Sequence, residues 1–277
     1  MARLAVIGAL AMAALAVLAP FPVQAQDGVP ENNRLQAFLE VTGFDVALES
    51  IALSAAGAPE MLGMSAGDFG SEWSRVAAEV FAPKTLRAMA VDMLEQTLTD
   101  DLLTHATGFY ASDLGRRLVL VENAAHLTDS EAKQAQGADL MRDAAPARQA
   151  ALEGLVAVIE GADTGLRAVQ EIQLRFLMAA SNAGVLDYQL DEEMLRALLQ
   201  RDQDEAREAL HVSNINATAY TYRDISVADL LAYSDALGAP EMQQVYELMN
   251  AIQFEIMANR FELLAARMAE LQPGQEL

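Results

Sequence analysis

The sequence predicts an all-α protein, a helical bundle built from two related, degenerate helical halves that follow a cleaved N-terminal signal peptide. Apolar residues recur three and four positions apart through almost the whole chain, which is typical of amphipathic helices. Runs of β-branched residues bounded by turn dipeptides, which indicate strands, are missing from the sequence. Hydrophobic residues make up 53% of the 277 residues, so the chain has enough apolar material to bury a core.

The charge balance and the cysteine count exclude several classes of function. The chain has 40 acidic and 18 basic residues, a formal net charge of −22. Because phosphate binding depends on Lys and Arg, we expect no nucleic-acid partner. The chain has no cysteine, which excludes disulfides, thiolate catalysis and thiolate metal clusters. We predict no cofactor.

Residues 1–25 have the pattern of a secretory signal peptide. Arg3 supplies a positive start, residues 4–19 form an uninterrupted apolar stretch, and small residues precede a cleavage site after Ala25. The alternative is an uncleaved membrane anchor, but the apolar stretch is shorter than the ~20 residues that a spanning helix needs. Arginine far outnumbers lysine and alanine is abundant, which indicates a GC-rich bacterial genome. We therefore expect a periplasmic protein that does not span the membrane after cleavage.

The first half, residues 26–128, should be helical after a short polar leader. Its expected helices begin near residues 35, 44, 73, 83, 99 and 112. Gly43 separates the first two, and Pro83 suits the first turn of its helix. Thr99 and Ser112 are predicted N-caps, because their side chains can accept hydrogen bonds from the first turn of the helix.

The second half, residues 129–277, should also be helical. Its expected helices begin near residues 129, 146, 166, 191, 227 and 240. Thr128 and Glu131 have the spacing of a capping box. A long acidic helix is expected over residues 191–211, and Ser226 is the predicted N-cap of the helix that follows it.

The last helix, expected from Pro240 to about Leu271, carries two apolar stripes. At about 100° per residue the second stripe lies a quarter to a third of a turn from the first. The helix should therefore change its packing partner near residues 252–257. It either passes between two helical layers of one protomer or forms a homo-dimer through its C-terminal heptad seam. We favour the first alternative, because three heptads are the minimum for a coiled coil.

A weak internal repeat appears at an offset of 127 residues. Thr99 corresponds to Ser226, and Leu103 corresponds to Leu230, in a short capped helix that turns into a longer one. One such hairpin cannot bury its apolar stripe alone, so two packed copies are the simplest interpretation. Chance similarity between alanine-rich helices is the alternative.

Residues 109–117, with the sequence Phe-Tyr-Ala-Ser-Asp-Leu-Gly-Arg-Arg, form the most specific motif in the chain. The stretch resembles the signature F-Y-x-S-x-x-G-[KR] of the bacterial domain-of-unknown-function family numbered twenty fifty-nine. Members of that family often have proline where this chain has Asp113. The resemblance covers about residues 85–125 and implies a small, exported, all-helical protein. It transfers no catalytic residue.

The residues of this motif predict a tight helix–turn–helix. Phe109 and Tyr110 are expected to be aromatic anchors at the end of one helix, and Ser112 caps the next. Gly115 should let another backbone come close. Arg116 lies in the first turn of its helix, where the helix dipole disfavours cations.

Arg117 lies in the same unfavourable turn, so we expect an acidic group near the two arginines. Asp100, Asp101 or an anionic ligand would serve. An acid of the chain itself is the favoured choice, because the protein is so acidic.

Two carboxylate–histidine pairs are the candidate metal ligands. Asp101 and His105 are four residues apart, as are Glu122 and His126, so each carboxylate lies beside its imidazole on one helix face. If the two helices pack antiparallel, the four side chains could together hold a divalent metal. The alternative is two exposed ion pairs, each worth under about 1 kcal/mol.

Standard catalytic motifs are absent from the sequence, so we expect no enzyme. The leading prediction is a non-catalytic interaction or envelope-maintenance module whose partner is an unknown protein or envelope component. The third-ranked prediction is a metal-dependent enzyme that uses His105 and His126.

The second-ranked prediction is a carrier that binds a lipid or other apolar ligand in a groove between the halves. The groove would be lined by flexible apolar side chains, namely Met61, Met64, Met242, Met249, Met257, Met268 and Phe254. A groove of about 300 Å³ or more would favour the carrier. Solid packing between the halves would favour the interaction module.

Overall fold

The computed structural model describes residues 31–159, 164–201 and 203–271. This part of the chain is helical without any strand, which confirms the predicted all-α class. The predicted signal peptide, residues 1–25, lies outside the described residues. The elements are α1 Glu31–Thr42, α2 Phe44–Ala55, α3 Ala58–Met61, the 3-10 turn η1 Ala66–Phe69, α4 Trp73–Val80, α5 Pro83–Thr97, α6 Asp100–Tyr110, α7 Asp113–His126, α8 Ser130–Asp143, α9 Pro146–Ile159, α10 Thr164–Asn182, α11 Glu192–Arg201, α12 Gln203–Thr221, α13 Val227–Leu237 and α14 Pro240–Leu271.

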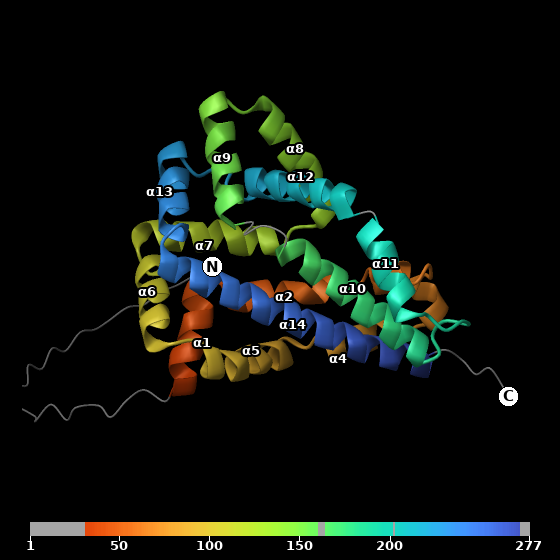
Figure 1. The fold of residues 1–277 in the computed structure, drawn as a ribbon. Coiled ribbons are helices and arrows are strands. Elements are labelled where there is room, and N and C mark those ends of the chain that lie inside the picture. The colour runs from red at the N-terminus through yellow and green to blue at the C-terminus, as the bar shows by residue number, and fades with distance from the viewer. Residues whose placement is uncertain (1–30, 160–163, 202, 272–277) are drawn as a thin grey trace, which may run out of the picture.

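The helices form two groups on either side of α7 (Figure 1). In the lower group, α14 lies against α10, α6, α5, α4 and α2, and α1 lies against α2, α5 and α6. In the upper group, α12 packs on α8 and α9, and α9 packs on α13. Helix α7 contacts α2 and α6 on one side and α12 on the other. The division of the chain at residue 128 stays a prediction; in space, α10 and α14 lie with the N-terminal helices.

Hydrogen bonds at the helix starts confirm three predicted N-caps. The side chains of Thr99, Ser112 and Ser226 each accept a hydrogen bond from the backbone N–H three residues further on, at 3.4, 3.0 and 3.1 Å. Gly43, at φ 72°, forms the predicted break between α1 and α2. Left-handed backbone of this kind favours glycine because it has no Cβ.

Two local predictions in the second half are wrong. Asp129, and not Thr128, caps α8: its Oδ1 accepts from the N–H of Ala132 at 2.9 Å. The Thr128 hydroxyl instead donates to the carbonyl of Ala124 at the end of α7. The acidic helix expected over 191–211 is two helices, because α11 packs on α10 in the lower group while α12 packs on α8 in the upper group.

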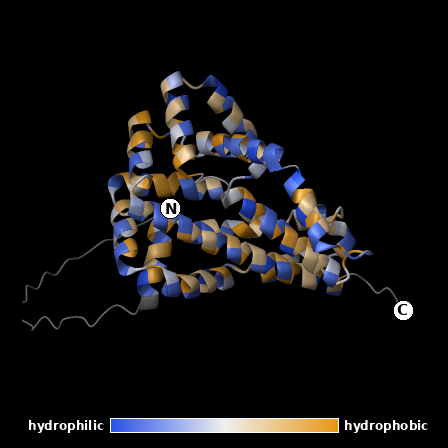
Figure 2. Ribbon diagram, viewed as in Figure 1, coloured by the Kyte–Doolittle hydropathy of each residue, from blue (hydrophilic) through white to orange (hydrophobic). Residues whose placement is uncertain are grey.

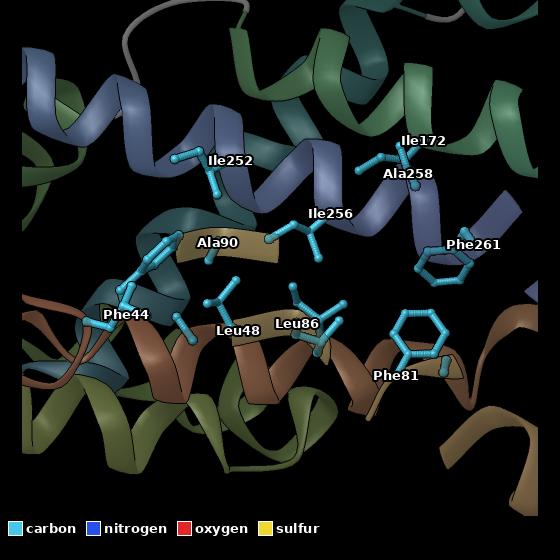
Figure 3. Packing of buried hydrophobic residues seen from close by; sticks show 14 of the residues in the cluster. Phe44, Leu48, Phe81, Leu86, Ala90, Ile172, Ile252, Ile256, Ala258 and Phe261 are labelled. Atoms are coloured by element: carbon cyan, nitrogen blue, oxygen red, sulfur yellow. The ribbon is translucent and has the colours of Figure 1, made fainter. Parts of the chain in front are cut away.

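One connected apolar core runs through both groups. Figure 3 shows Ile252 and Ile256 of α14 facing Leu48 of α2 and Leu86 of α5. Figure 2 shows hydrophobic and hydrophilic residues alternating along the helices, as expected when each helix buries one face.

The last helix changes its packing partner along its length, as predicted. Near its start, Gln243 donates to carbonyls of α13 and α9. Further on, the ring of Phe261 packs edge-on against Phe81 and against Phe176 of α10, with centroids 5.3 and 5.5 Å apart. Phe261, Leu264 and Met268 of the predicted dimer seam are at most 2% exposed. These side chains are therefore used within the protomer and are not available to a second copy.

The two capped hairpins have matching boundaries. Helix α13 covers the residues of α6 shifted by 127, and α14 begins 127 residues after α7. The boundaries therefore support the predicted repeat, which stays a prediction.

Among the described residues, no single helix has the length and apolar composition needed to cross a membrane. A bent pair, residues 33–42 and 44–61, passes this test by length and composition only.

Candidate functional site

The turn between α6 and α7 places the motif residues, and Gly115 allows it to be tight. A Cβ on Gly115 would lie 2.3 Å from the carbonyl oxygen of Phe109 and 2.5 Å from the Cα of Tyr110. Any side chain at Gly115 would therefore push the two helices apart. The predicted close approach of a backbone to this glycine is confirmed, and the backbone is that of the motif itself.

The acids that compensate the two motif arginines belong to the chain. Arg117 makes two hydrogen bonds to Asp229, at 3.0 and 3.1 Å, and so joins the start of α7 to the start of α13. Arg116 pairs with Asp113. The expectation of an acidic neighbour is confirmed, but the acids differ from those proposed, since Asp100 is paired with Arg34 at 2.8 Å.

The aromatic pair of the motif positions a tyrosine of the second hairpin. The ring of Phe109 is stacked on that of Tyr233, with centroids 5.8 Å apart and planes 5° apart. Tyr233 also meets Tyr222 edge-on at 5.9 Å. Both Tyr233 and Tyr110 are at most 3% exposed. The motif therefore fixes the place of an aromatic cluster between α6, α7 and α13.

Glu122 of α7 lies at the centre of this cluster. The hydroxyl of Tyr222 donates to Glu122 Oε1 at 2.7 Å, and the hydroxyl of Tyr233 donates to the same oxygen at 2.9 Å. Among the described residues, no hydrogen bond reaches Oε2 and no Lys, Arg or His forms an ion pair with Glu122. One oxygen of the carboxylate therefore accepts two hydrogen bonds, and the carboxylate forms no ion pair with a described residue.

A cavity of about 360 Å³ lies beside this carboxylate, between the two groups of helices. Glu122 is the one carboxylate among its lining residues, which come from α1, α2, α6, α7, α8, α9, α12, α13, α14 and the connections between them. The lining residues are Thr42, Gly43, Phe44, Ala47, Tyr110, Glu122, Asn123, Ala125, His126, Lys133, Val156, Ile159, Asn214, Ala217, Thr218, Thr221, Tyr222, Tyr233, Tyr246, Met249, Asn250 and Gln253. The wall is mixed: tyrosines and amides supply polar groups, and Phe44 and the aliphatic residues supply apolar surface.

Burial controls the protonation of the acidic groups in the wall. It raises the pKa of the Glu122 carboxyl above its ordinary value, while the hydroxyls of Tyr222 and Tyr233 act in the opposite direction. Burial, followed by the charge of Glu122, raises the pKa of Tyr110 and Tyr246 as well. The tyrosines therefore stay protonated and remain hydrogen-bond donors at neutral pH.

Neither of the two basic side chains of the wall, His126 and Lys133, forms an ion pair with Glu122 among the described residues. Burial lowers the pKa of His126, and the charge of Lys133 lowers it further, so His126 is neutral at pH 7. The Nζ of Lys133 donates to the carbonyl of Ala125 at 3.3 Å. The cavity therefore holds a carboxylate that is not in direct contact with the one lysine of the wall.

The structure does not bring the four predicted metal ligands together. Asp101 and His105 lie on an exposed face of α6, whereas Glu122 and His126 line the cavity. In the described ranges, no group of three His, Asp or Glu side chains is placed to hold a metal ion. The reason is that Glu122 is turned toward the hydroxyls of Tyr222 and Tyr233, whereas Asp101 and His105 face away from the core.

The predicted methionine groove is also not formed as proposed. Met242 and Met268 are buried in the core at 1% and 0% exposure, and Met61 is exposed. Of the proposed lining, Met249 alone borders the cavity. The space between the helix groups is larger than the expected 300 Å³, but its wall is polar as well as apolar.

Sequence reasoning missed the tyrosines that surround Glu122. Tyr222 and Tyr233 lie 100 and 111 residues from Glu122 in the chain, so no local spacing relates them. One usable signal existed: the chain has only 6 tyrosines, and several of them fall in and around the second hairpin.

We predict that Glu122→Gln raises the melting temperature of the ligand-free protein at pH 7. A raised pKa in the folded state means that Glu122 contributes stability in acid, which is lost as the pH rises through that pKa. The amide has no charge to desolvate and still accepts hydrogen bonds from the tyrosines. The advantage of the variant should therefore shrink as the pH falls and the wild-type carboxyl becomes protonated.

Thermal unfolding followed by circular dichroism between pH 4 and 8, values that bracket the ordinary carboxyl pKa, would measure this. Glu153→Gln is the control, because Glu153 is exposed on α9 and its replacement should leave the difference from wild type independent of pH. A Glu122→Gln melting temperature below wild type at pH 7 would contradict the prediction.

Comparison with known proteins relates the site to a bacterial family. No curated protein and no solved structure matches the chain. Residues 84–143, which span α5 to α8 and include the motif and Glu122, match the model of that family. This confirms the resemblance noted from the motif: over these residues the chain is similar to DUF2059, described as uncharacterized protein conserved in bacteria.

Proposed function

We propose that this protein is an exported, non-catalytic binding protein of the bacterial cell envelope that holds a small molecule in the Glu122 cavity. The observation that carries the proposal is the cavity itself. Its volume of about 360 Å³ falls within the range of about 300–1,000 Å³ that is usual for small-molecule sites. Export is supported by the signal-peptide pattern of residues 1–25.

The wall of the cavity favours an amphipathic ligand over a lipid chain. The polar groups near Glu122 and the apolar side chains of Phe44, Val156 and Ile159 share one space. A purely apolar ligand would leave Oε2 of Glu122 without a hydrogen-bond partner, which is costly in a buried site. The cavity also favours a binding protein over an interaction module, which would need solid packing between the helix groups.

Binding rather than catalysis is proposed because the wall offers no activated nucleophile. The hydroxyls of Thr42 and Thr221 donate to backbone carbonyls of their own helices, at 2.8 Å each. The two hydroxyls that donate to Glu122 belong to Tyr222 and Tyr233, whose pKa burial raises, so they are not activated as nucleophiles. Groups fixed in this way orient a ligand.

Filling the cavity tests the proposal. Ala217 lines the cavity from α12, whereas Ala209 lies on an exposed face of the same helix. A fragment library would be screened against the mature protein by the shift in melting temperature, since a ligand at 100 times its Kd stabilises by about 2.7 kcal/mol. Ala217→Phe should abolish the shifts, and Ala209→Phe should keep them.

Two results would contradict the proposed function. One is that no fragment raises the melting temperature of the wild-type protein. The other is that the hits bind Ala217→Phe as tightly as Ala209→Phe in isothermal titration calorimetry, which would place them outside the cavity.

A further inference from the structure

We infer that the ligand of the Glu122 cavity is a protonated amine, whose ammonium group donates a hydrogen bond to the free oxygen of Glu122. This inference rests on the proposed function and names the chemical class of the ligand. It is carried by three features of the cavity: the single carboxylate, the direction of the tyrosine hydroxyls, and the absence of a cation beside the carboxylate in the described part of the chain.

The charge of Glu122 is the first of these features. A carboxylate removed from water is stabilised by a cation that donates hydrogen bonds, and an unpaired one is costly. Glu122 is the one carboxylate of the wall, and it forms no ion pair within the described ranges. Lys133 donates to the carbonyl of Ala125, and His126 is kept neutral. Lys133 is the cation of the wall, but it forms no ion pair with Glu122. A cation in direct contact with Glu122 Oε2 would therefore have to come from the ligand.

The hydrogen bonds of the tyrosine hydroxyls are the second feature. The hydroxyl groups of Tyr222 and Tyr233 each donate their one hydrogen to Glu122 Oε1. A tyrosine hydroxyl has one hydrogen and two lone pairs, so the Tyr222 oxygen can still accept a hydrogen bond beside the carboxylate, whereas the Tyr233 hydroxyl also bonds to that of Tyr110. Glu122 Oε2 is also an acceptor. A ligand group that contacts Glu122 Oε2 must therefore supply an N–H or O–H donor, and an ammonium group supplies up to three.

The apolar part of the wall and the net charge of the protein also favour an amine with a short hydrocarbon body. The apolar residues of the wall, such as Phe44, Val156 and Ile159, accept a short hydrocarbon or aromatic body. The formal net charge of −22 raises the local concentration of cations around the protein. An anionic ligand would be repelled by the net negative charge of the protein.

Calorimetry with matched probes on the wild-type mature protein tests the inference. The probes are benzylammonium and propylammonium, each compared with the alcohol and the carboxylate of the same carbon skeleton. Each ammonium should bind at least about tenfold more tightly than its alcohol, as expected for a hydrogen bond to a charged group. An alcohol or a carboxylate that binds as tightly as the ammonium would overturn the inference.

Two variants with the same change of net charge locate the effect. Glu122→Gln keeps the shape of the side chain and the acceptor for the tyrosines but removes the charge, so ammonium affinity should fall about 10- to 100-fold. Glu153→Gln removes an exposed charge on α9 and should leave the affinity within about twofold, because surface charges are screened. Equal affinities in the two variants would overturn the inference.

The source of the amine is resolved by a further probe, lysine blocked as N-acetyl and C-terminal amide. Tighter binding of this probe than of propylammonium supports a lysine side chain of a partner protein, and weaker binding supports a free small amine. If no amine binds to the wild-type protein, but other fragments do bind and lose their affinity in Ala217→Phe, the amine inference fails and the proposed function stands. If nothing binds, both fail.

Discussion

Replacing Phe261 with Ala is expected to lower the free energy of unfolding by about 3–5 kcal/mol, the usual cost of truncating a buried aromatic side chain. Phe261 is 2% exposed and lies where α14 meets α10 and the end of α4, at Phe81. Its ring packs edge-on against Phe81 and Phe176, contacts that are worth more than area burial alone. The alanine would leave a cavity between three helices that cannot collapse independently.

Urea unfolding followed by circular dichroism would measure this loss. Leu263→Ala is the matched control on the same helix, because Leu263 is 38% exposed and its truncation should cost under about 1 kcal/mol. For a chain of this size the Phe261→Ala loss corresponds to a fall in melting temperature of about 6–20 °C. Equal losses for the two variants would show that the C-terminal half of α14 does not pack as the structure has it.

Replacing Gly137 with Ala should destabilise the protein although alanine is the better helix former. Gly137 lies inside α8, and a Cβ there would lie 2.0 Å from the carbonyl oxygen of Asn216 on α12. Because that atom is backbone, the two helices must move apart, and overpacking of this kind costs about 1–3 kcal/mol or more. The movement would also disturb α12, which forms one wall of the cavity.

Gly154→Ala is the matched control for this prediction. Gly154 lies inside α9 and is exposed, and a Cβ added there would have no atom within 4 Å. Alanine at this position should stabilise by about 0.5–1 kcal/mol through helix propensity. The two substitutions are chemically identical, so opposite signs in urea unfolding are expected. A stabilising Gly137→Ala would mean that α8 and α12 are not in close contact.

The local features of the fold were predictable because their causes are local. Thr99, Ser112 and Ser226 are N-caps because a side-chain oxygen three residues before a free N–H satisfies it in any protein. The spacing of apolar residues likewise indicated helices and the change of packing partner along α14. The tightness of the turn at Gly115 followed from the small side chain alone.

The partners of these local features were not predictable. The acid for Arg117 is Asp229, 112 residues further along the chain, and periodicity does not relate helices that far apart. For the same reason the acidic stretch 191–211 divides into α11 and α12: each packs on a different helix group. The spacing of four residues predicts that Glu122 and His126 lie on one face of α7. It does not predict which helix packs against that face.

The amino-acid sequence alone determined that the chain is helical, where most helices begin, and that it carries a motif similar to that of DUF2059, because hydrogen bonding, helix periodicity and charge act over a few residues. Only the tertiary structure decided that Glu122 is a cavity residue instead of a metal ligand. The hydroxyls that hold it come from Tyr222 and Tyr233, 100 and 111 residues away in the chain, and only the packing of helices distant in sequence brings these rings to one carboxylate.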